Sequence, residues 1–115
     1  MFGNNSLSLG RVYDTVTINE GGEKLILHVN ADPNRIVVGL SEAQKRLVTI
    51  NEETPKEERD EIALFFASVL FGEEQAKKLL DFYYGDSSCV VSMCALYFAK
   101  RLKKKIEKAQ KVLRK

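Results

Sequence analysis

The sequence predicts an α+β fold that is mostly α-helical, with an N-terminal β-hairpin followed by a bundle of about four helices. Near the N-terminus, two segments rich in β-branched residues flank a Gly-Gly turn, which is typical of a hairpin. Beyond residue 33, apolar residues recur at steps of three and four, which is typical of amphipathic helices. A chain of 115 residues usually forms one domain, which we place at residues 13–115. Residues 1–12 begin with a stretch rich in Gly, Asn and Ser, and we expect them to be a flexible segment.

We expect the hairpin to span residues 13–29. YDTVTI at residues 13–18 predicts the first strand, KLILHV at residues 24–29 predicts the second, and the intervening NEGG supplies the turn. A lone two-stranded hairpin is marginal in water, so it must lie on the helices or pair with another chain. We expect His28 on the outer face of the second strand and not at a metal site, because neither cysteine lies near it in the sequence.

The first helix is expected at residues 33–51. Asp32 can cap its N-terminus, and Pro33 suits the first helical position because its missing N–H would be unpaired there in any case. Gly39 weakens the prediction, since glycine costs about 1 kcal/mol in a helix interior. The apolar stripe recurs at steps of four and three, through Ile36, Leu40, Ala43, Leu47 and Ile50.

Few other parts of the chain are as apolar as residues 61–85, around which we expect the other elements to pack. They predict two helices, at residues 55–71 and 73–84, folded back on each other at Gly72. A residue without Cβ can end a helix in the left-handed conformation without steric cost, and Gly85 is expected to end the second helix in the same way. The apolar positions of the pair are Ile62, Phe65, Phe66, Val69, Leu70, Leu79, Leu80, Phe82 and Tyr83.

The start of the second predicted helix carries the pattern of a capping box. The Thr54 hydroxyl can accept a hydrogen bond from a first-turn amide, and Glu57 can reach back to the Thr54 amide. Pro55 would then occupy the first helical position. The acidic residues that follow suit the positive end of the helix dipole.

The last helix is expected at residues 87–112, with Asp86 as its cap. Its apolar stripe narrows after Leu102 while lysines fill the other faces. We therefore expect its first half to be packed core, and its second half to project or to lie on a partner. The stripe consists of Val90, Val91, Cys94, Phe98, Leu102, Ile106, Ala109 and Leu113.

The sequence contains no pattern of catalytic groups. Cys89 and Cys94 stand five residues apart and are interpreted as buried or half-buried thiols. The acidic residues of 52–61 are interpreted as a solvated helix start. Without a convergent nucleophile, base and orienting group we expect no enzyme, cofactor or metal site. No run approaches the ~20 apolar residues of a membrane span, and no secretory signal pattern is present, so we expect no membrane association and a cytoplasmic protein.

The C-terminal end of the chain is strongly basic. Residues 1–99 contain 9 basic and 15 acidic side chains, whereas residues 100–115 contain 9 basic and 1 acidic. This end allows three interpretations: a solvated helix end, pairing with an acidic protein surface such as that of a neighbouring copy, or binding to nucleic acid or an anionic membrane. Nucleic acid is disfavoured because no aromatic residue interleaves with the lysines. The candidate interaction residues are Lys100, Arg101, Leu102, Lys103, Lys104, Lys105, Ile106 and Lys108.

Three segments together carry a family resemblance. They are the hairpin at residues 15–29, ALFFASVLFGEEQAKK at residues 63–78, and IEKAQKVL at the end of the last helix. This order of elements resembles the tail assembly chaperones of long-tailed bacteriophages and of prophages in Gram-positive bacteria.

The resemblance implies a non-enzymatic protein of the host cytoplasm. Such chaperones coat the tape measure protein and leave as the tail tube protein arrives, and they self-associate, often in rings or spirals. An acidic body and a basic end on one chain agree with self-association, because oppositely charged ends favour head-to-tail contact. The alternative function is a small nucleic-acid-binding regulatory protein that uses the basic last helix.

Overall fold

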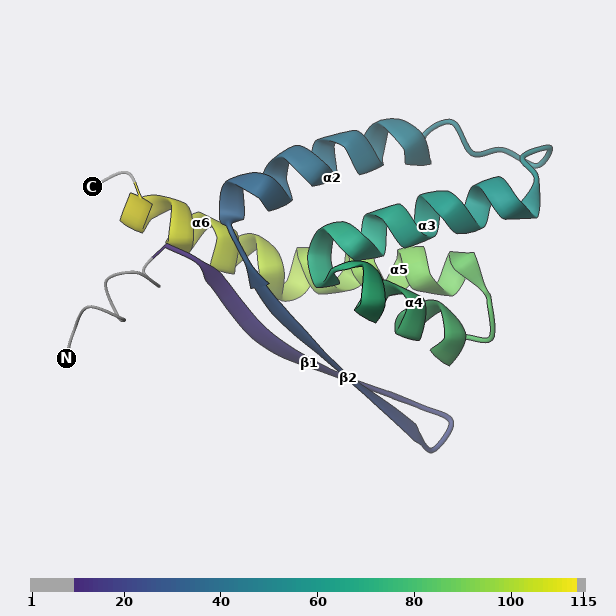
Figure 1. The fold of residues 1–115 in the computed structure, drawn as a ribbon, viewed down its shortest axis with the longest axis horizontal. Coiled ribbons are helices and arrows are strands. Elements are labelled where there is room, and N and C mark those ends of the chain that lie inside the picture. The colour runs from purple at the N-terminus through teal and green to yellow at the C-terminus, as the bar shows by residue number, and fades with distance from the viewer. Residues whose placement is uncertain (1–9, 114–115) are drawn as a thin grey trace.

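A computed structural model describes residues 10–113, so most of the N-terminal segment predicted to be flexible lies outside the described residues. The described chain is a two-stranded hairpin followed by four helical rods, the last of which runs unbroken through α5, η1 and α6 (Figure 1). This confirms the predicted α+β, mostly α-helical class. The elements are β1 (Val12–Glu20), β2 (Glu23–Ala31), α2 (Pro33–Leu47), α3 (Lys56–Phe71), α4 (Glu73–Phe82), α5 (Ser87–Tyr97), the π-helical turn η1 (Phe98–Leu102) and α6 (Lys103–Leu113).

The hairpin is longer than predicted and lies with one face on the helices. Its strands pair antiparallel from Val12 opposite Ala31 to Glu20 opposite Glu23. Side chains alternate between the two faces, so Val16, Leu27 and other inward residues are buried, while His28 is exposed on the outer face as predicted. The turn end of the hairpin projects beyond the helices (Figure 1).

Helix α2 begins as predicted, because the Asp32 carboxylate accepts a hydrogen bond from the Asn34 amide at 2.8 Å. It ends at Leu47 and not at residue 51. The Thr49 amide and hydroxyl both bond to the carbonyl of Arg46, at 3.1 and 2.7 Å. The chain therefore tightens into i→i−3 turns, a common way for a helix to end.

Gly39 has a packing role in the interior of α2. A Cβ built on Gly39 would lie 2.7 Å from Val69 Cγ1 and 2.9 Å from Val69 Cγ2 on α3. Ordinary contacts between carbon atoms are about 3.5–4.0 Å. Glycine therefore lets α2 and α3 approach closely, which the helix propensity of the sequence does not reveal.

The capping box predicted at Thr54 is wrong. Pro55 is the cap residue of α3, and no side-chain cap is present. The Thr54 hydroxyl instead accepts from the Asn51 amide at 2.9 Å, and only 8% of Thr54 is exposed. A local turn with Asn51 has taken the hydroxyl that the cap would need.

Glycine and tyrosine end the central helices differently from the prediction. Gly72 has φ 85° and ψ 159°, which is not the left-handed helical conformation but an extended region open almost only to glycine. At the end of α4, Tyr84 has φ 54°. The Gly85 amide bonds to the Leu80 carbonyl and the Tyr84 amide to the Asp81 carbonyl, both at 2.9 Å, which is the Schellman pattern. Tyr84 therefore takes the left-handed position of the cap, one residue before Gly85, which itself has a positive φ of 80°. Helix α4 stops at Phe82.

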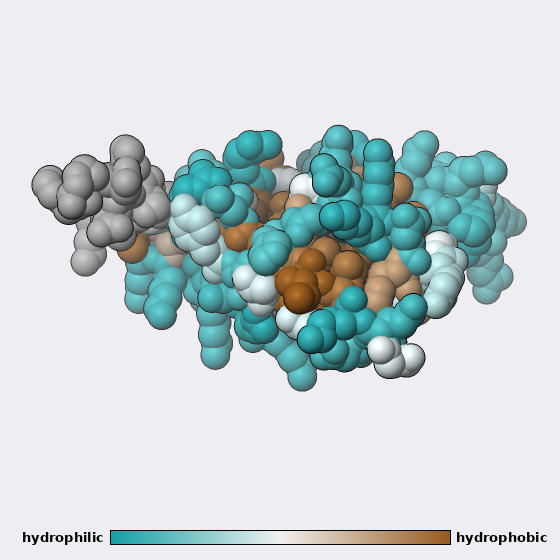
Figure 2. All heavy atoms as spheres, turned by 60° about the horizontal axis from the view of Figure 1, so that its bottom comes forward, coloured by the Kyte–Doolittle hydropathy of each residue, from teal (hydrophilic) through white to brown (hydrophobic). Residues whose placement is uncertain are grey.

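The core lies between the hairpin, α3 and the last helix. Asp86 caps that helix as predicted, accepting from the Cys89 amide at 3.3 Å. The side from which the hairpin projects is largely hydrophilic around a central apolar area (Figure 2). The largest fully buried side chains are those of Leu27, Ile36, Leu70, Leu79, Leu102, Val12, Val90, Pro33 and Cys94.

Candidate functional site

Asp14 joins the hairpin to the last helix. The Tyr97 hydroxyl donates to Asp14 Oδ2 at 2.7 Å, and Arg101 Nη2 donates to both carboxylate oxygens at 2.7 Å. Arg101 also donates to the carbonyl of Thr15 at 2.8 Å. The Asp14 side chain is 10% exposed and that of Arg101 is 49% exposed. This pairing holds β1 against the last helix, so Arg101 has a structural role.

The electrostatics of this contact follow from burial and hydrogen bonding. Burial alone would raise the pKa of Asp14, but the hydrogen bonds from Arg101, Tyr97 and the Thr15 amide outweigh it and lower that pKa. The pKa of the Tyr97 hydroxyl is raised, first by burial and then by its bond to the Asp14 carboxylate. The carboxylate is thus held charged and the phenol neutral, which is the arrangement of a structural ion pair.

Both edges of the hairpin are bound near their centres. Gln75 of α4 accepts from the His28 amide and donates to the His28 carbonyl, each at 2.7 Å. The Gln75 amide therefore occupies the edge of β2 as a neighbouring strand would. On β1, the Arg101 side chain donates a hydrogen bond to the Thr15 carbonyl. Pairing with another chain along the middle of the hairpin would have to displace these side chains.

The structure divides the predicted interaction residues into three groups. Leu102 is fully buried and Ile106 is 4% exposed, so both belong to the core. Arg101 is paired with Asp14, and Lys105 Nζ lies 3.9 Å from the same carboxylate. The remaining candidates, which stay predictions, are the exposed residues Lys100, Lys103, Lys104 and Lys108.

Sequence reasoning missed Asp14 as the partner of Arg101. One signal was present: Asp14 alternates with Val12 and Val16 on the strand face that becomes buried. A carboxylate on an apolar strand face needs a partner. The pattern alone could not say that this partner stands 87 positions away.

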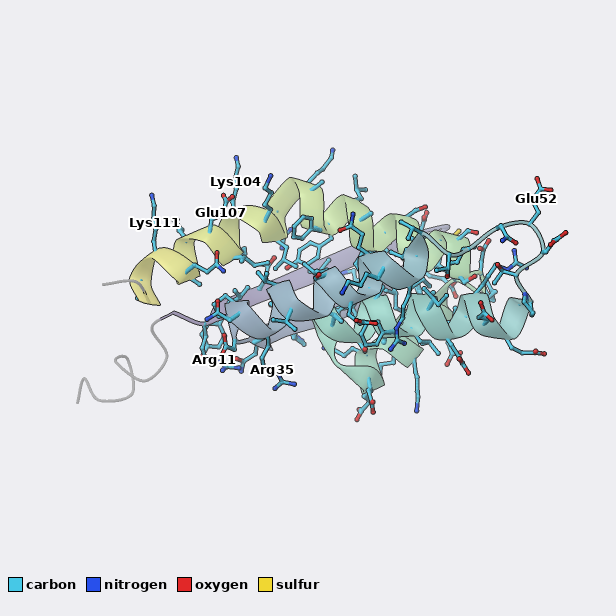
Figure 3. All side chains as sticks on the ribbon, turned by 90° about the horizontal axis from the view of Figure 1, so that it is seen from above. Arg11, Arg35, Glu52, Lys104, Glu107 and Lys111 are labelled. Atoms are coloured by element: carbon cyan, nitrogen blue, oxygen red, sulfur yellow. The ribbon has the colours of Figure 1, made fainter. Side chains whose placement is uncertain are left out.

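Glu52 and a group of basic side chains lie towards opposite ends of the long axis of the molecule, whose extents are 52 × 33 × 22 Å. Figure 3 shows Glu52 at one end, in the loop between α2 and α3, and Arg11, Arg35 and Lys111 towards the other. Lys104 and Lys111 project to one side of the basic end, whereas Arg11 and Arg35 project to the other (Figure 3). The basic end therefore has a lysine side and an arginine side.

The arginine side opens into a cleft of about 1000 Å³ between β2, α2 and the α3–α4 junction, here called the Arg11–Arg35 cleft. Arg11 donates to the side chain and carbonyl of Asn30, at 2.9 and 3.2 Å. Among the described residues, no hydrogen bond or salt bridge joins the Arg35 side chain to another residue. The cleft walls include the apolar side chains of Ile36, Phe65, Val69, Leu70 and Phe71.

A second groove, of about 350 Å³, runs between α2 and the last helix, and we call it the α2–α6 groove. Its apolar walls come from both sides, and 43% of Val37 remains exposed there. Phe98, which lines this groove, is also the first residue of the π-helical turn η1. The groove is lined by Val37, Leu40, Ser41, Gln44, Phe98, Lys103, Ile106, Glu107 and Gln110.

Other potential sites in residues 10–113 are sparse. Cys94 is buried and Cys89 half-buried, as predicted, and burial raises the pKa of the Cys94 thiol to about 12. Within the described range, no three His, Cys, Asp or Glu side chains are placed to hold a metal ion. In the same range, no helix combines the length and apolarity that crossing a bilayer requires.

Comparison with protein-family models, curated proteins and solved structures gives no match to this chain.

Proposed function

We propose that this chain is a non-enzymatic tail assembly chaperone of a long-tailed phage or prophage, acting in the host cytoplasm. It self-associates and holds segments of the tape measure protein until the tail tube protein arrives. The resemblance suggests the class of protein, and the surfaces of the molecule suggest which of them binds the client.

The α2–α6 groove is the single observation that carries this proposal. Its lining combines apolar side chains, including Val37, Leu40 and Phe98, with charged ones, Lys103 and Glu107. Proteins that bind helices do so by receiving the apolar face of an amphipathic helix in such a groove. A client with apolar residues at steps of three and four would therefore fit here, and we assign this role to a helical segment of the tape measure protein.

The experiment is capture of tape measure fragments by variants that differ only in where a charge is placed. Val37→Lys puts a charge into the groove, and Val38→Lys puts the same charge on the neighbouring position of α2, which does not line the groove. Val37 is 43% and Val38 71% exposed, so both variants are expected to fold.

The proposal expects the wild-type chain and Val38→Lys to capture a tape measure fragment in isothermal titration calorimetry. Val37→Lys should bind about tenfold more weakly, because a buried lysine must be desolvated in the groove. Equal binding by both variants would remove the groove as the client site. Failure of the wild-type chain to bind any fragment would remove the tape measure protein as the client.

The lysine side of the basic end supports a second candidate, a nucleic-acid-binding regulatory protein. Lys104 and Lys111 project together from α6 (Figure 3), and Lys108 is also exposed. Contacts between lysines and phosphates would give an affinity that falls steeply with salt. A gel shift with DNA or RNA at low salt, lost in Lys104→Glu/Lys108→Glu, would favour this function, whereas no shift at low salt would eliminate it.

A further inference from the structure

The loop at the acidic end, residues 48–53, combines charge with exposed apolar surface. Glu52 and Glu53 are exposed carboxylates, and Val48 is 75% exposed beside them. Ile50 is half-buried. A segment with this composition would be stabilised by an apolar surface flanked by cations.

The Arg11–Arg35 cleft provides such a surface. Arg11 and Arg35 line it together with the apolar side chains of Phe65 and Val69. Two acidic residues also line the cleft, Asp32, whose carboxylate accepts from the Asn34 amide as the helix cap, and Glu73 at the start of α4. Within residues 10–113, no salt bridge joins either carboxylate to Arg11 or Arg35.

The two surfaces cannot meet within one chain. Glu52 lies at one end of the long axis and Arg11 and Arg35 lie towards the other (Figure 3), on a molecule 52 Å long. A contact between two different surfaces of identical chains repeats from copy to copy, so it builds rings or filaments.

We propose that residues 48–53 of one copy bind in the Arg11–Arg35 cleft of the next copy. This inference rests on the self-association included in the proposed function, and it names the interface. Arg35 pairs with the carboxylates of Glu52 and Glu53, while Val48 covers the apolar wall. The cleft is favoured over the lysine side of the same end because a guanidinium matches a carboxylate in two-point geometry, whereas an exposed lysine is a mobile point charge.

The experiment is a charge exchange followed by light scattering across a series of micromolar concentrations. Arg35→Glu reverses the cleft, and Glu52→Arg reverses the loop. Lys104→Glu makes an equal change of charge on the lysine side of the basic end and tests that side as the competing interface. Lys78→Glu makes the same change at a residue of α4 that lines neither the groove nor the cleft, and it is the matched control. All four positions are exposed, and circular dichroism checks that each variant is folded.

The wild-type chain, the control Lys78→Glu and the lysine-side variant Lys104→Glu should associate alike, while Arg35→Glu and Glu52→Arg should each associate about tenfold more weakly. An equimolar mixture of these two should recover association, because each reversed loop then meets a reversed cleft, and each native loop a native cleft. Normal association of Arg35→Glu, or a mixture that stays dissociated, would overturn the interface.

Two further outcomes separate this inference from the proposed function. Dissociation by Lys104→Glu but not by Arg35→Glu would overturn the cleft and leave self-association through the lysine side. A wild-type chain that is monomeric at every concentration would overturn both self-association and the interface, while capture of tape measure fragments would still be decided by the groove variants.

Discussion

Replacing Gly39 with alanine has two opposite effects on the free energy of unfolding, one from helix propensity and one from packing, and the structure indicates that the packing effect is larger. Alanine is about 1 kcal/mol more favourable than glycine in a helix interior, so propensity alone predicts a more stable protein. The new Cβ would however lie 2.7 and 2.9 Å from the two γ-carbons of Val69. Val69 cannot easily rotate away, because a β-branched side chain has one strongly preferred rotamer in a helix.

The magnitude follows from the movement that the clash demands. Ordinary carbon contacts require about 1 Å more separation, so α2 and α3 must move apart. Overpacking of this kind costs about 1–3 kcal/mol. After the propensity gain, Gly39→Ala should lower the free energy of unfolding by about 1 kcal/mol and the melting temperature by about 4 °C.

Urea unfolding of a double-mutant cycle with Val69→Ala measures this effect. Val69→Ala alone should destabilise by about 1–2 kcal/mol through lost packing. In the double variant the new methyl group occupies the space left by Val69, so the two changes should be non-additive by about 1 kcal/mol or more. A stabilised Gly39→Ala protein, or additive effects, would refute the close approach of the two helices.

Three further predictions concern two contacts between distant segments and the π-helical turn η1. Asp14→Asn should lower the free energy of unfolding by about 2 kcal/mol at neutral pH. The folded-state pKa of Asp14 is lowered, so its contribution is present above the unfolded pKa near 3.8 and is lost as the pH falls through the folded value. Urea midpoints of the wild-type chain and this variant should therefore converge in acid, and a constant difference would contradict the assignment. Gln75→Ala should speed hydrogen exchange of the His28 amide, which Gln75 protects, and an unchanged rate by NMR would show that the edge of β2 is protected otherwise. Deleting Ala99 from η1 should leave a cooperative thermal transition, because the buried positions of the last helix then follow steps of four and three throughout. Deleting Ala67 from the regular helix α3 should not, because Leu70 and Phe71 would turn away from the core. Circular dichroism measures both transitions, and equal damage by the two deletions would contradict the role of η1.

Local signals in the sequence predicted most of the helix starts and the hairpin. Asp32 caps α2 and Asp86 caps α5 because the carboxylate and the amides it accepts from lie within three residues of each other. The capping signal at Thr54 was wrong, because a first-turn amide of α3 and the Asn51 amide compete for the same hydroxyl. Asn51 is the partner that wins, and propensity does not rank such close alternatives.

Contacts between distant elements could not be predicted in the same way. The bond from Gln75 to His28 spans 47 positions, and the one from Arg101 to Asp14 spans 87. Arg101 was grouped with the lysines around it because charge is visible in a sequence and a distant partner is not. The predicted interaction surface therefore covered the whole basic end, whereas the Arg11–Arg35 cleft comes from β2, α2, α3 and α4, which only folding brings together.

The π-helical turn η1 explains how the last helix contributes both to the core and to the contact between Arg101 and Asp14. Buried positions of the last helix follow steps of four and three up to Tyr97, then a step of five to Leu102, and then four and three again to Ala109. In a regular α-helix a step of five would turn the second stripe away from the core. The wider turn of η1, at Phe98–Leu102, takes up the extra residue and keeps both stripes buried. Because Arg101 lies inside this turn, the irregular step that places it beside Asp14 also fixes the direction in which α6 leaves the core, and with it the position of the α6 wall of the α2–α6 groove.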